Sequence, residues 1–365
     1  MPAFATRPLP PAVPPARPLV VRFGALGDMV LLTGLLGLLH RRYGVPCDVL
    51  TSGAWGAPLY AAHPDVGAVI ALNSRKRPYW SDPAQWRAVA ALRARPRGPV
   101  YVADEFALDK LAALLDRAGI AAADTLWLHR RDDVRAEHWL DRWAQFARTA
   151  PPAWADACPA AEPTGALLPR LVVDPAARAA LPAWLARRGL AGRTLLLVHA
   201  GNKRTLRRGR LGRLGDSKHW PHARWIGLLR ALAAAHPDAT LLLTGTPPEQ
   251  ALLAALVRGA GLPPQRLQAL GDDLPLPRLL ALLAVAAGMV SIDTGPAHAA
   301  AALGCPLLVL YGAAAPGAWR PRGPGAIATL GGPPQRARVD QIGLDEVLQA
   351  CARLPLRAAS SGTRA

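Results

Sequence analysis

Short apolar segments alternate with longer helical segments along this chain, and this alternation constrains its fold more than any other feature. Strands that alternate with helices favour βαβ units, whose strands are parallel. We therefore expect an α/β protein. The segments with strand character cover residues 19–23, 47–51, 68–72, 99–103, 194–199, 239–244, 267–270, 288–293 and 306–311.

The alternation occurs twice, and a stretch rich in Pro and Ala at residues 151–169 separates the two series. A chain of 365 residues is long enough for two domains, each with its own core. We expect two Rossmann-like domains, preceded by a disordered Pro-rich lead-in that does not resemble a signal peptide. The predicted boundaries are 1–18 for the lead-in, 19–160 and 161–340 for the domains, and 341–365 for a C-terminal helix and frayed tail.

The chain is strongly basic, with a formal net charge of +18 and a pI near 11.1. Such a charge suits nucleic acid, an anionic membrane face or a phosphorylated substrate, and many of the arginines are spread along helices. The four cysteines are far apart, which argues against a zinc site or a disulfide framework. No apolar run is long enough to span a bilayer. We expect a cytoplasmic protein, with peripheral contact to a membrane left open.

The most informative stretch begins with the strand at 288–293 and continues through Thr294, Gly295, Pro296 and His298 into an Ala-rich helix. Thr294 is a suitable N-cap residue, and Gly295 permits close approach of a ligand. A helix start collects unpaired N–H groups and partial positive charge, which suits a phosphate. An ordinary capped joint with a buried histidine is the alternative.

A second glycine turn follows the first strand, where Gly24, Gly27 and Asp28 open an apolar helix. The spacing differs from the dinucleotide-binding G-x-G-x-x-G pattern, so it does not predict NAD binding. We expect Asp28 at the end of the strand, directed toward the space between the domains. There it would act as a general base. Its alternative role is to complement the helix dipole.

Further candidates follow other strands. Gly201 opens a basic loop at 202–216, and Lys218 comes just before a helix. Glu249 follows the strand at 239–244, where it would bond a ribose or, alternatively, serve as a first-turn helix acid. Because ligands of α/β sheets bind at the carboxyl ends of the strands, we expect these residues to share one edge. The basic loop residues Arg75, Lys76 and Arg77 follow a strand of the first domain.

Together these residues resemble glycosyltransferase family 9, the ADP-heptose:lipopolysaccharide heptosyltransferases. The motifs that carry the resemblance are Gly27-Asp28 with the helix after it, His63-Pro64-Asp65, Lys218-His219-Trp220-Pro221, Thr244-Gly245 with Glu249, Asp293-Thr294-Gly295-Pro296 with His298, and Tyr311-Gly312.

The resemblance implies a GT-B fold, in which the two parallel sheets face a central cleft. It also implies an inverting transfer without a metal or other cofactor, at the cytoplasmic face of the inner membrane. Asp28 would be the base, next to Gly27 on the acceptor side. Independently of the resemblance, the positive charge of Arg75, Lys76 and Arg77, with part of the loop at 202–216, suits phosphorylated core sugars or an anionic membrane leaflet. On the donor side, Lys218 and Thr294 would hold the diphosphate, Glu249 the ribose, and Asp293 and His298 the sugar or phosphate, beside Gly201 and Gly295.

The implied donor is ADP-heptose or a related nucleotide sugar, and the implied acceptor is a lipopolysaccharide core or another anionic glycan. Residues 80–169 carry no motif that identifies the acceptor. Three alternatives stay open: an epimerase-like enzyme that acts on the donor alone, a basic nucleic-acid-binding protein, and an inactive relative. The nucleic-acid alternative lacks a recognised binding motif, and we expect no nucleic-acid partner.

Overall fold

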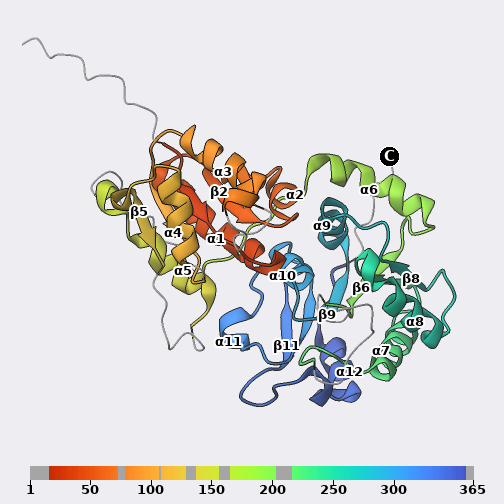
Figure 1. Cartoon of the computed structure of the whole chain (residues 1–365). Coiled ribbons are helices and arrows are strands. Elements are labelled where there is room, and N and C mark those ends of the chain that lie inside the picture. The colour runs from red at the N-terminus through yellow and green to blue at the C-terminus, as the bar shows by residue number, and fades with distance from the viewer. Residues whose placement is uncertain are drawn as a thin grey trace, which may run out of the picture.

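The chain forms two lobes, each built on its own sheet (Figure 1). The computed structural model describes residues 16–72, 79–106, 108–128, 137–155, 165–202 and 216–358. Both sheets are entirely parallel among these residues, and helices connect successive strands. The prediction of an α/β protein with two Rossmann-like units is confirmed. The predicted boundaries near 18, 160 and 340 stay predictions.

The first sheet has the strand order β3-β2-β1-β4-β5. Its strands are β1 (Leu19–Val21), β2 (Cys47–Ser52), β3 (Val66–Leu72), β4 (Val100–Val102) and β5 (Thr125–Trp127). The helices of this lobe are α1 (Leu26–Tyr43), α2 (Gly56–Tyr60), α3 (Pro83–Arg93), α4 (Leu108–Arg117) and α5 (Trp139–Arg148). The spacing of apolar residues from about 124 to 156 predicts helical structure, and this prediction is wrong for β5. Its three residues pair with β4, and that pairing outweighs the local helical pattern.

The second sheet has the strand order β11-β10-β9-β6-β7-β8. Its strands are β6 (Thr194–His199), β7 (Ala239–Thr244), β8 (Leu267–Leu270), β9 (Gly288–Ile292), β10 (Leu307–Tyr311) and β11 (Ile327–Gly331). Its helices are α6 (Pro175–Arg187), α7 (His222–Ala235), α8 (Gln250–Ala260), α9 (Leu276–Val285), α10 (Gly295–Ala302), α11 (Pro316–Trp319) and α12 (Leu344–Arg353). The sequence analysis missed β11, a half-buried edge strand that pairs with β10 along its whole length.

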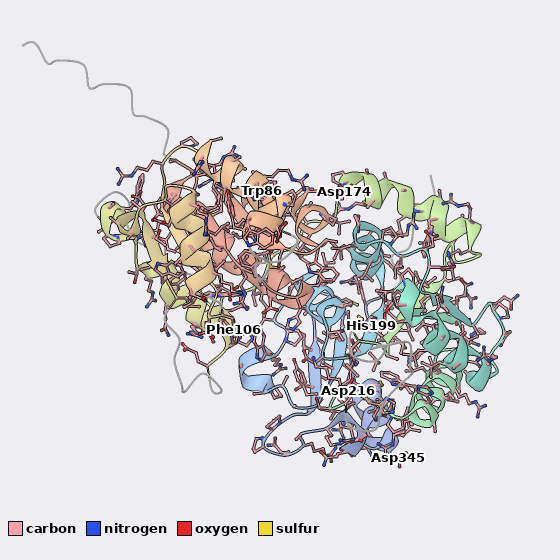
Figure 2. The ribbon with its side chains drawn as sticks, in the orientation of Figure 1. Trp86, Phe106, Asp174, His199, Asp216 and Asp345 are labelled. Atoms are coloured by element: carbon pink, nitrogen blue, oxygen red, sulfur yellow. The ribbon has the colours of Figure 1, made fainter. Side chains whose placement is uncertain are left out.

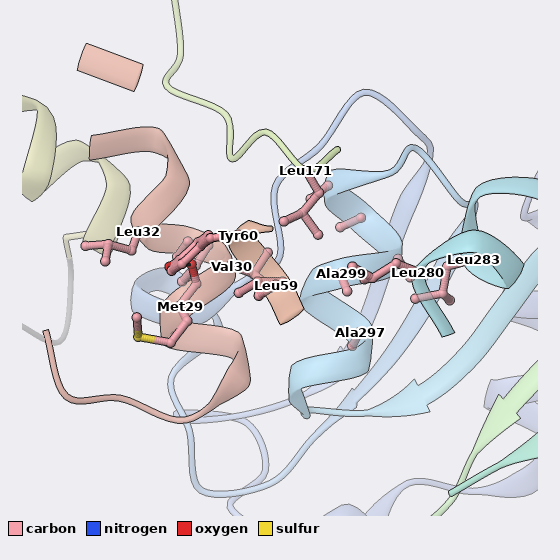
Figure 3. Close-up of a cluster of buried hydrophobic side chains, with 14 of the residues drawn as sticks. Met29, Val30, Leu32, Leu59, Tyr60, Leu171, Leu280, Leu283, Ala297 and Ala299 are labelled. Carbon is pink, nitrogen blue, oxygen red and sulfur yellow. Dashed lines mark hydrogen bonds between the residues drawn. The ribbon is translucent and has the colours of Figure 1, made fainter. Parts of the chain in front are cut away.

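An apolar cluster joins the two lobes where α1 packs against α10 (Figure 3). Met29 and Leu32 of α1 belong to the same buried cluster as Ala297 and Ala299 of α10. Alanine is small, so its helix can lie close to the large side chains of α1. Burial of each methylene group contributes about 0.8 kcal/mol, so this shared core holds the lobes in contact.

Aromatic rings make a second contact between the lobes. The ring centroids of Trp139 and Trp143 are 5.6 Å apart, and Trp319 of the second lobe lies 5.2 Å from Trp139. Both α5 tryptophans are almost fully buried. Two tryptophans one helical turn apart in the sequence predict core or interdomain packing, and the structure confirms this prediction. Beside the rings, the Arg322 guanidinium bonds both carboxylate oxygens of Asp141, at 2.6 and 2.5 Å.

His138 bonds both lobes, and its titration should make the contact sensitive to acid. Its Nδ1 accepts from the Leu140 N–H at 3.1 Å, so Nε2 carries the proton and donates to the Arg320 carbonyl at 2.7 Å. Burial lowers the pKa of His138 to about 4. Protonation would place a second N–H against that of Leu140.

We expect the His138 contribution to the free energy of unfolding to decrease as the pH falls from 6.5 toward 4. Its pKa is lower in the folded chain than in the unfolded chain, so its contribution is complete above 6.5 and is lost through this window. The loss amounts to about 3 kcal/mol. Denaturant titrations at several pH values should show a flatter profile for His138→Asn, which keeps a side-chain cap for α5. An unchanged slope in that variant would contradict the assignment.

Candidate functional site

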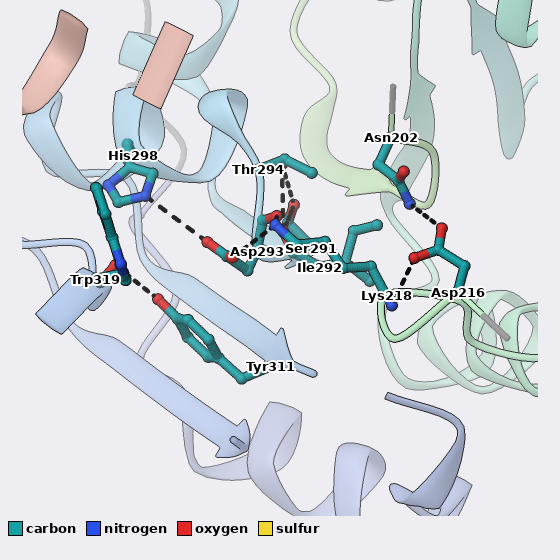
Figure 4. A network of polar contacts seen from close by, with 10 residues as sticks. All are labelled: Asn202, Asp216, Lys218, Ser291, Ile292, Asp293, Thr294, His298, Tyr311 and Trp319. Atoms are coloured by element: carbon teal, nitrogen blue, oxygen red, sulfur yellow. Dashed lines mark hydrogen bonds and ion pairs between the residues drawn. The ribbon is translucent and has the colours of Figure 1, made fainter. Parts of the chain in front are cut away.

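The start of α10 forms the centre of the candidate site (Figure 4). Thr294 is the N-cap residue, and Pro296 lies in the first turn, as the sequence predicted. The predicted hydrogen bond was wrong, however, because the Thr294 side chain caps no backbone N–H of the helix. Its hydroxyl donates to the Ile292 carbonyl at 3.2 Å and lies 3.2 Å from the Ser291 hydroxyl. The Ala297 and His298 N–H groups instead donate to the Thr294 carbonyl, at 3.1 and 3.4 Å, and Pro296 has no N–H. The Gly295 N–H is thus the first-turn group that is left to another acceptor.

Lys218 and Asp293 form the charged pair of the site. The Lys218 Nζ donates to the backbone carbonyl and to Oδ2 of Asp293, both at 2.7 Å. Burial raises the pKa of the Asp293 carboxyl, but His298 and Lys218 lower it by a larger amount. The pKa of Asp293 is therefore below its usual value. An ammonium group has three N–H donors, and Asp293 occupies two of them. The third N–H of Lys218 can therefore donate to an anionic oxygen of a ligand while both bonds to Asp293 are kept.

A glycine after β10 allows Lys218 to reach Asp293. A Cβ at Gly312 would lie 1.9 Å from the Ser217 carbonyl oxygen, so any side chain here would displace the turn before Lys218. On the other side, Trp220 is buried and donates from Nε1 to the Ile342 carbonyl at 2.9 Å. The Lys218-His219-Trp220-Pro221 and Tyr311-Gly312 motifs thus hold one turn in place.

His298 lies one turn into α10, and only 5% of it is exposed. Its Nε2 is 3.8 Å from Oδ1 of Asp293, which is an ion-pair distance longer than a hydrogen bond. Its Nδ1 is buried and has no hydrogen-bond partner in the described part of the chain. A buried polar atom without a partner is costly, so this nitrogen suits a polar ligand.

Glu249 is buried and has a structural role. Its Oε2 accepts from the N–H and from the hydroxyl of Thr246, both at 2.8 Å. This is the first-turn acid that the sequence analysis gave as the alternative, and a ribose contact stays a prediction. A Cβ at Gly201 would lie 2.2 Å from Oε1 of Glu249, so Gly201 lets the carboxylate approach the end of β6.

The donor-side residues share one edge of the second sheet. Gly201 follows β6, Glu249 follows β7, Asp293 follows β9 and Gly312 follows β10. These strands are neighbours in the order β10-β9-β6-β7, and all are parallel. The predicted common edge is confirmed. Figure 2 labels His199, the last residue of β6, and Asp216, which accepts from the Lys218 N–H at 3.1 Å.

Asp28 lies inside α1 rather than at the end of β1, because the helix begins at Leu26. Its Oδ2 accepts from the Ala25 N–H at 2.9 Å, and this bond is the helix-start role that the sequence left open. Its Oδ1 lies 2.6 Å from Nη2 of Arg22. The side chain is 19% exposed, so a substrate hydroxyl could still reach the carboxylate.

The starts of α1 and α10 meet at the junction between the lobes. A Cβ at Gly27 would lie 2.8 Å from the His298 ring, and a Cβ at Gly295 would lie 2.6 Å from Cβ of Leu26. Each glycine thus permits contact with the opposite lobe. The residue after Gly27 is Asp28, and the junction brings this carboxylate to the same region as the α10 start.

Some predicted residues lie outside the described part of the chain. These are Arg75, Lys76 and Arg77 of the acceptor side and most of the basic loop at 202–216. Within the described ranges, no three His, Cys, Asp or Glu side chains gather as metal ligands. In the same ranges, no helix combines the length and the apolar character that crossing a membrane requires.

Sequence reasoning missed Arg22 as a partner of Asp28. The signal was available, since Arg22 is a charged residue directly after an apolar strand, where a side chain is expected to be buried. A buried charge needs a partner. The missing information was which residue across the turn would supply it.

Two parallel Rossmann-like sheets in this arrangement define the GT-B fold, and solved structures share it. The chain resembles ADP-heptose lipopolysaccharide heptosyltransferase II of E. coli with a TM-score of 0.66 and 20% identity, covering 92% of this chain and 97% of that one. The E. coli heptosyltransferase WaaC with ADP gives 0.65 and 21%, covering 92% and 99%. A family 9 glycosyltransferase of Veillonella parvula gives 0.71 and 14%, covering 92% and 96%.

Residues 212–341 match the model of glycosyltransferase family 9 (heptosyltransferase). This segment contains the candidate residues from Lys218 to His298, and the predicted resemblance is confirmed there. Lipopolysaccharide heptosyltransferase 3 of Escherichia coli is 32% identical over 104 residues, which are 28% of this chain and 30% of that relative. The matched segment thus spans less than a third of the relative's length. Together these comparisons show the GT-B fold and, over residues 212–341, similarity to glycosyltransferase family 9.

Proposed function

We propose that this protein is an inverting glycosyltransferase that moves a heptose or related sugar from a nucleotide-diphospho-sugar to an anionic glycan. The observation that carries the proposal is the meeting of two helix starts between the lobes. One presents Asp28, and the other presents the Gly295 N–H and the unpartnered His298 nitrogen, beside the Lys218 ammonium group. A carboxylate beside an anion-binding seat suits a reaction that removes one proton and releases a diphosphate.

In the proposed step, the acceptor hydroxyl oxygen forms a bond to the anomeric carbon while its proton passes to Asp28. The bond between that carbon and the diphosphate oxygen breaks, and its electron pair leaves with the nucleoside diphosphate. The oxygen gains charge as the bond breaks. Lys218 and the Gly295 N–H at the start of α10 would stabilise that charge, and no metal is required for the step.

ADP-heptose is the donor we propose. Two structures that this chain resembles are E. coli heptosyltransferase WaaC with ADP and the same protein with ADP-2-deoxy-2-fluoro heptose. The present chain shares their fold, and its second lobe carries the family match. A diphosphate would lie at the α10 start, within reach of the remaining donor of Lys218.

A thermal-shift panel of nucleoside diphosphates and nucleotide sugars would test this donor. A ligand at one hundred times its dissociation constant stabilises the fold by about 2.7 kcal/mol. We expect ADP and ADP-heptose to raise the Tm more than their UDP and GDP counterparts. The donor incubated alone should keep its sugar unaltered, in contrast to an epimerase. If no nucleoside diphosphate shifted the Tm, the proposal would fail.

The first lobe would bind the acceptor, for which we propose a lipopolysaccharide core or a similar anionic glycan. Exposed aromatic side chains on this lobe support a partner with apolar faces, such as sugar rings or lipid. Trp86 and Phe106 are 45% and 60% exposed (Figure 2). With the net charge of +18, we also propose peripheral contact with the cytoplasmic face of an anionic membrane. Binding to anionic vesicles should weaken steeply with added salt, and salt-insensitive binding would count against this contact.

A further inference from the structure

Arg22 is a buried cation in contact with Asp28. It directly follows β1, in the first sheet, and only 4% of the residue is exposed. Its Nη2 lies 2.6 Å from Oδ1 of Asp28, and its Nη1 donates to the Ala103 carbonyl at 3.0 Å. A charge-assisted bond of this kind is stronger than a neutral one. The carboxylate is thus held from one side by a group that cannot easily move.

Two tryptophan rings hold the guanidinium itself. The Arg22 Cζ lies 5.0 Å from the ring centroid of Trp139 and 5.5 Å from that of Trp143. A desolvated cation over an indole face is attracted by the negative face of the ring. Since the Ala103 carbonyl fixes the other side, the guanidinium is held in one place. The rings, the carbonyl and Arg22 form one rigid support behind Asp28.

The support also touches the second lobe. Trp319 packs on Trp139 with ring centroids 5.2 Å apart, and the next residue, Arg320, accepts from His138 through its carbonyl. The position of Trp139 therefore depends on how the lobes meet. Trp139 thus contacts both Trp319 of the second lobe and Arg22, which bonds Asp28.

We propose that Arg22 is a positioning residue for the Asp28 base, held by Trp139 and Trp143 at the lobe junction. The inference rests on the proposed function and deepens it. Oδ1 is held by Arg22 and Oδ2 by the Ala25 N–H, so the plane of the carboxylate is fixed. Each oxygen retains a lone pair for the acceptor proton. Arg22 does not itself touch the substrate, and it acts through Asp28.

A double-mutant cycle tests the proposal, using Arg22→Met, Asp28→Asn and their combination. The assay follows ADP release from ADP-heptose with heptose-free lipopolysaccharide as acceptor. We expect Arg22→Met to lower kcat at least tenfold with little change in KM for ADP-heptose, and Arg22→Lys to recover part of the loss. In the Asp28→Asn background, Arg22→Met should lower kcat no further. A full additional loss in that background, or an unchanged kcat in the single variant, would overturn the proposal.

Arg42→Met is the matched control. Arg42 is also a buried arginine of the first lobe, and its Nη1 bonds the Ala147 and Arg148 carbonyls rather than Asp28. Arg42→Met should lower the free energy of unfolding but should not lower kcat selectively. An equal loss of kcat in this control would show that Arg22 acts through folding and would overturn the proposal.

A crystal structure of Arg22→Met supplies a readout that needs no substrate. We expect the Asp28 side chain to leave its present rotamer or to refine as several conformers. An Asp28 carboxylate that keeps its position would overturn the proposal even if the variant were inactive. Full turnover in Asp28→Asn would instead refute the proposed base, and the crystal structure would still decide whether Arg22 positions the carboxylate.

Discussion

Replacing Asp28 with asparagine is expected to reduce turnover by about 10²- to 10⁴-fold and to leave ADP binding nearly unchanged. The amide cannot accept the proton of an acceptor hydroxyl at neutral pH. ADP would bind at the α10 start, which belongs to the other lobe. Initial rates of ADP release, combined with calorimetric titration of ADP, would separate the two effects.

The asparagine variant needs a control for stability. Arg22 and the Ala25 N–H both donate to Asp28, whereas an asparagine has one acceptor oxygen and one donor group. One of the two donors would lose its acceptor, at a cost of about 1–3 kcal/mol. The assay temperature should therefore lie well below the Tm of the variant. Turnover equal to that of the unaltered protein would refute Asp28 as the base.

Replacing Lys218 with methionine is expected to weaken ADP binding at least tenfold and to lower stability. The substitution removes the cation 2.7 Å from Oδ2 of a buried carboxylate. Breaking a buried pair typically costs about 3–5 kcal/mol, and the 27% exposure of the Lys218 side chain argues for a smaller loss. Calorimetry with ADP and denaturant unfolding would measure the two losses.

The stability loss of Lys218→Met should depend on pH. The low folded-state pKa of Asp293 contributes stability above the unfolded pKa, and this contribution disappears as the pH falls through the folded value. The difference between the unaltered protein and Lys218→Met should therefore shrink in acid. Asp293→Asn is the matched control, because it removes the charge of the pair but retains the ammonium group. If ADP affinity were unchanged in Lys218→Met, Lys218 would have no part in binding the diphosphate.

The alternation of strands and helices predicted the fold well because parallel sheets leave a strong local pattern. It also predicted the common edge of Gly201, Glu249 and Asp293, since parallel strands bring their carboxyl ends together. The edge strands β5 and β11 were harder to predict. Each owes its strand conformation to the neighbour with which it pairs, and that neighbour is distant in the sequence.

The directions and partners of the side chains at the site could not be predicted from the sequence. Thr294 is at the predicted cap position, but its hydroxyl bonds the Ile292 carbonyl, which the strand end happens to present. Asp28 is at the predicted junction, but it belongs to the helix. Its partner, Arg22, is six residues away, and the chain turns between them at Gly24, where a Cβ would lie 2.3 Å from Cβ of Asp28. Local patterns predict positions, whereas the partners depend on the folded chain.

The close contacts at Gly27 and Gly295 set the distance between the start of α1, with the proposed base, and the start of α10, with the proposed diphosphate site. At each point the main chain of one lobe lies directly against a side chain of the other, with the nearest atoms 2.8 and 2.6 Å from where a methyl carbon would be. Even an alanine would therefore act as a wedge. Because this spacing depends on two missing methyl groups, the surface loops of both lobes are free to diverge while the two helix starts keep their separation.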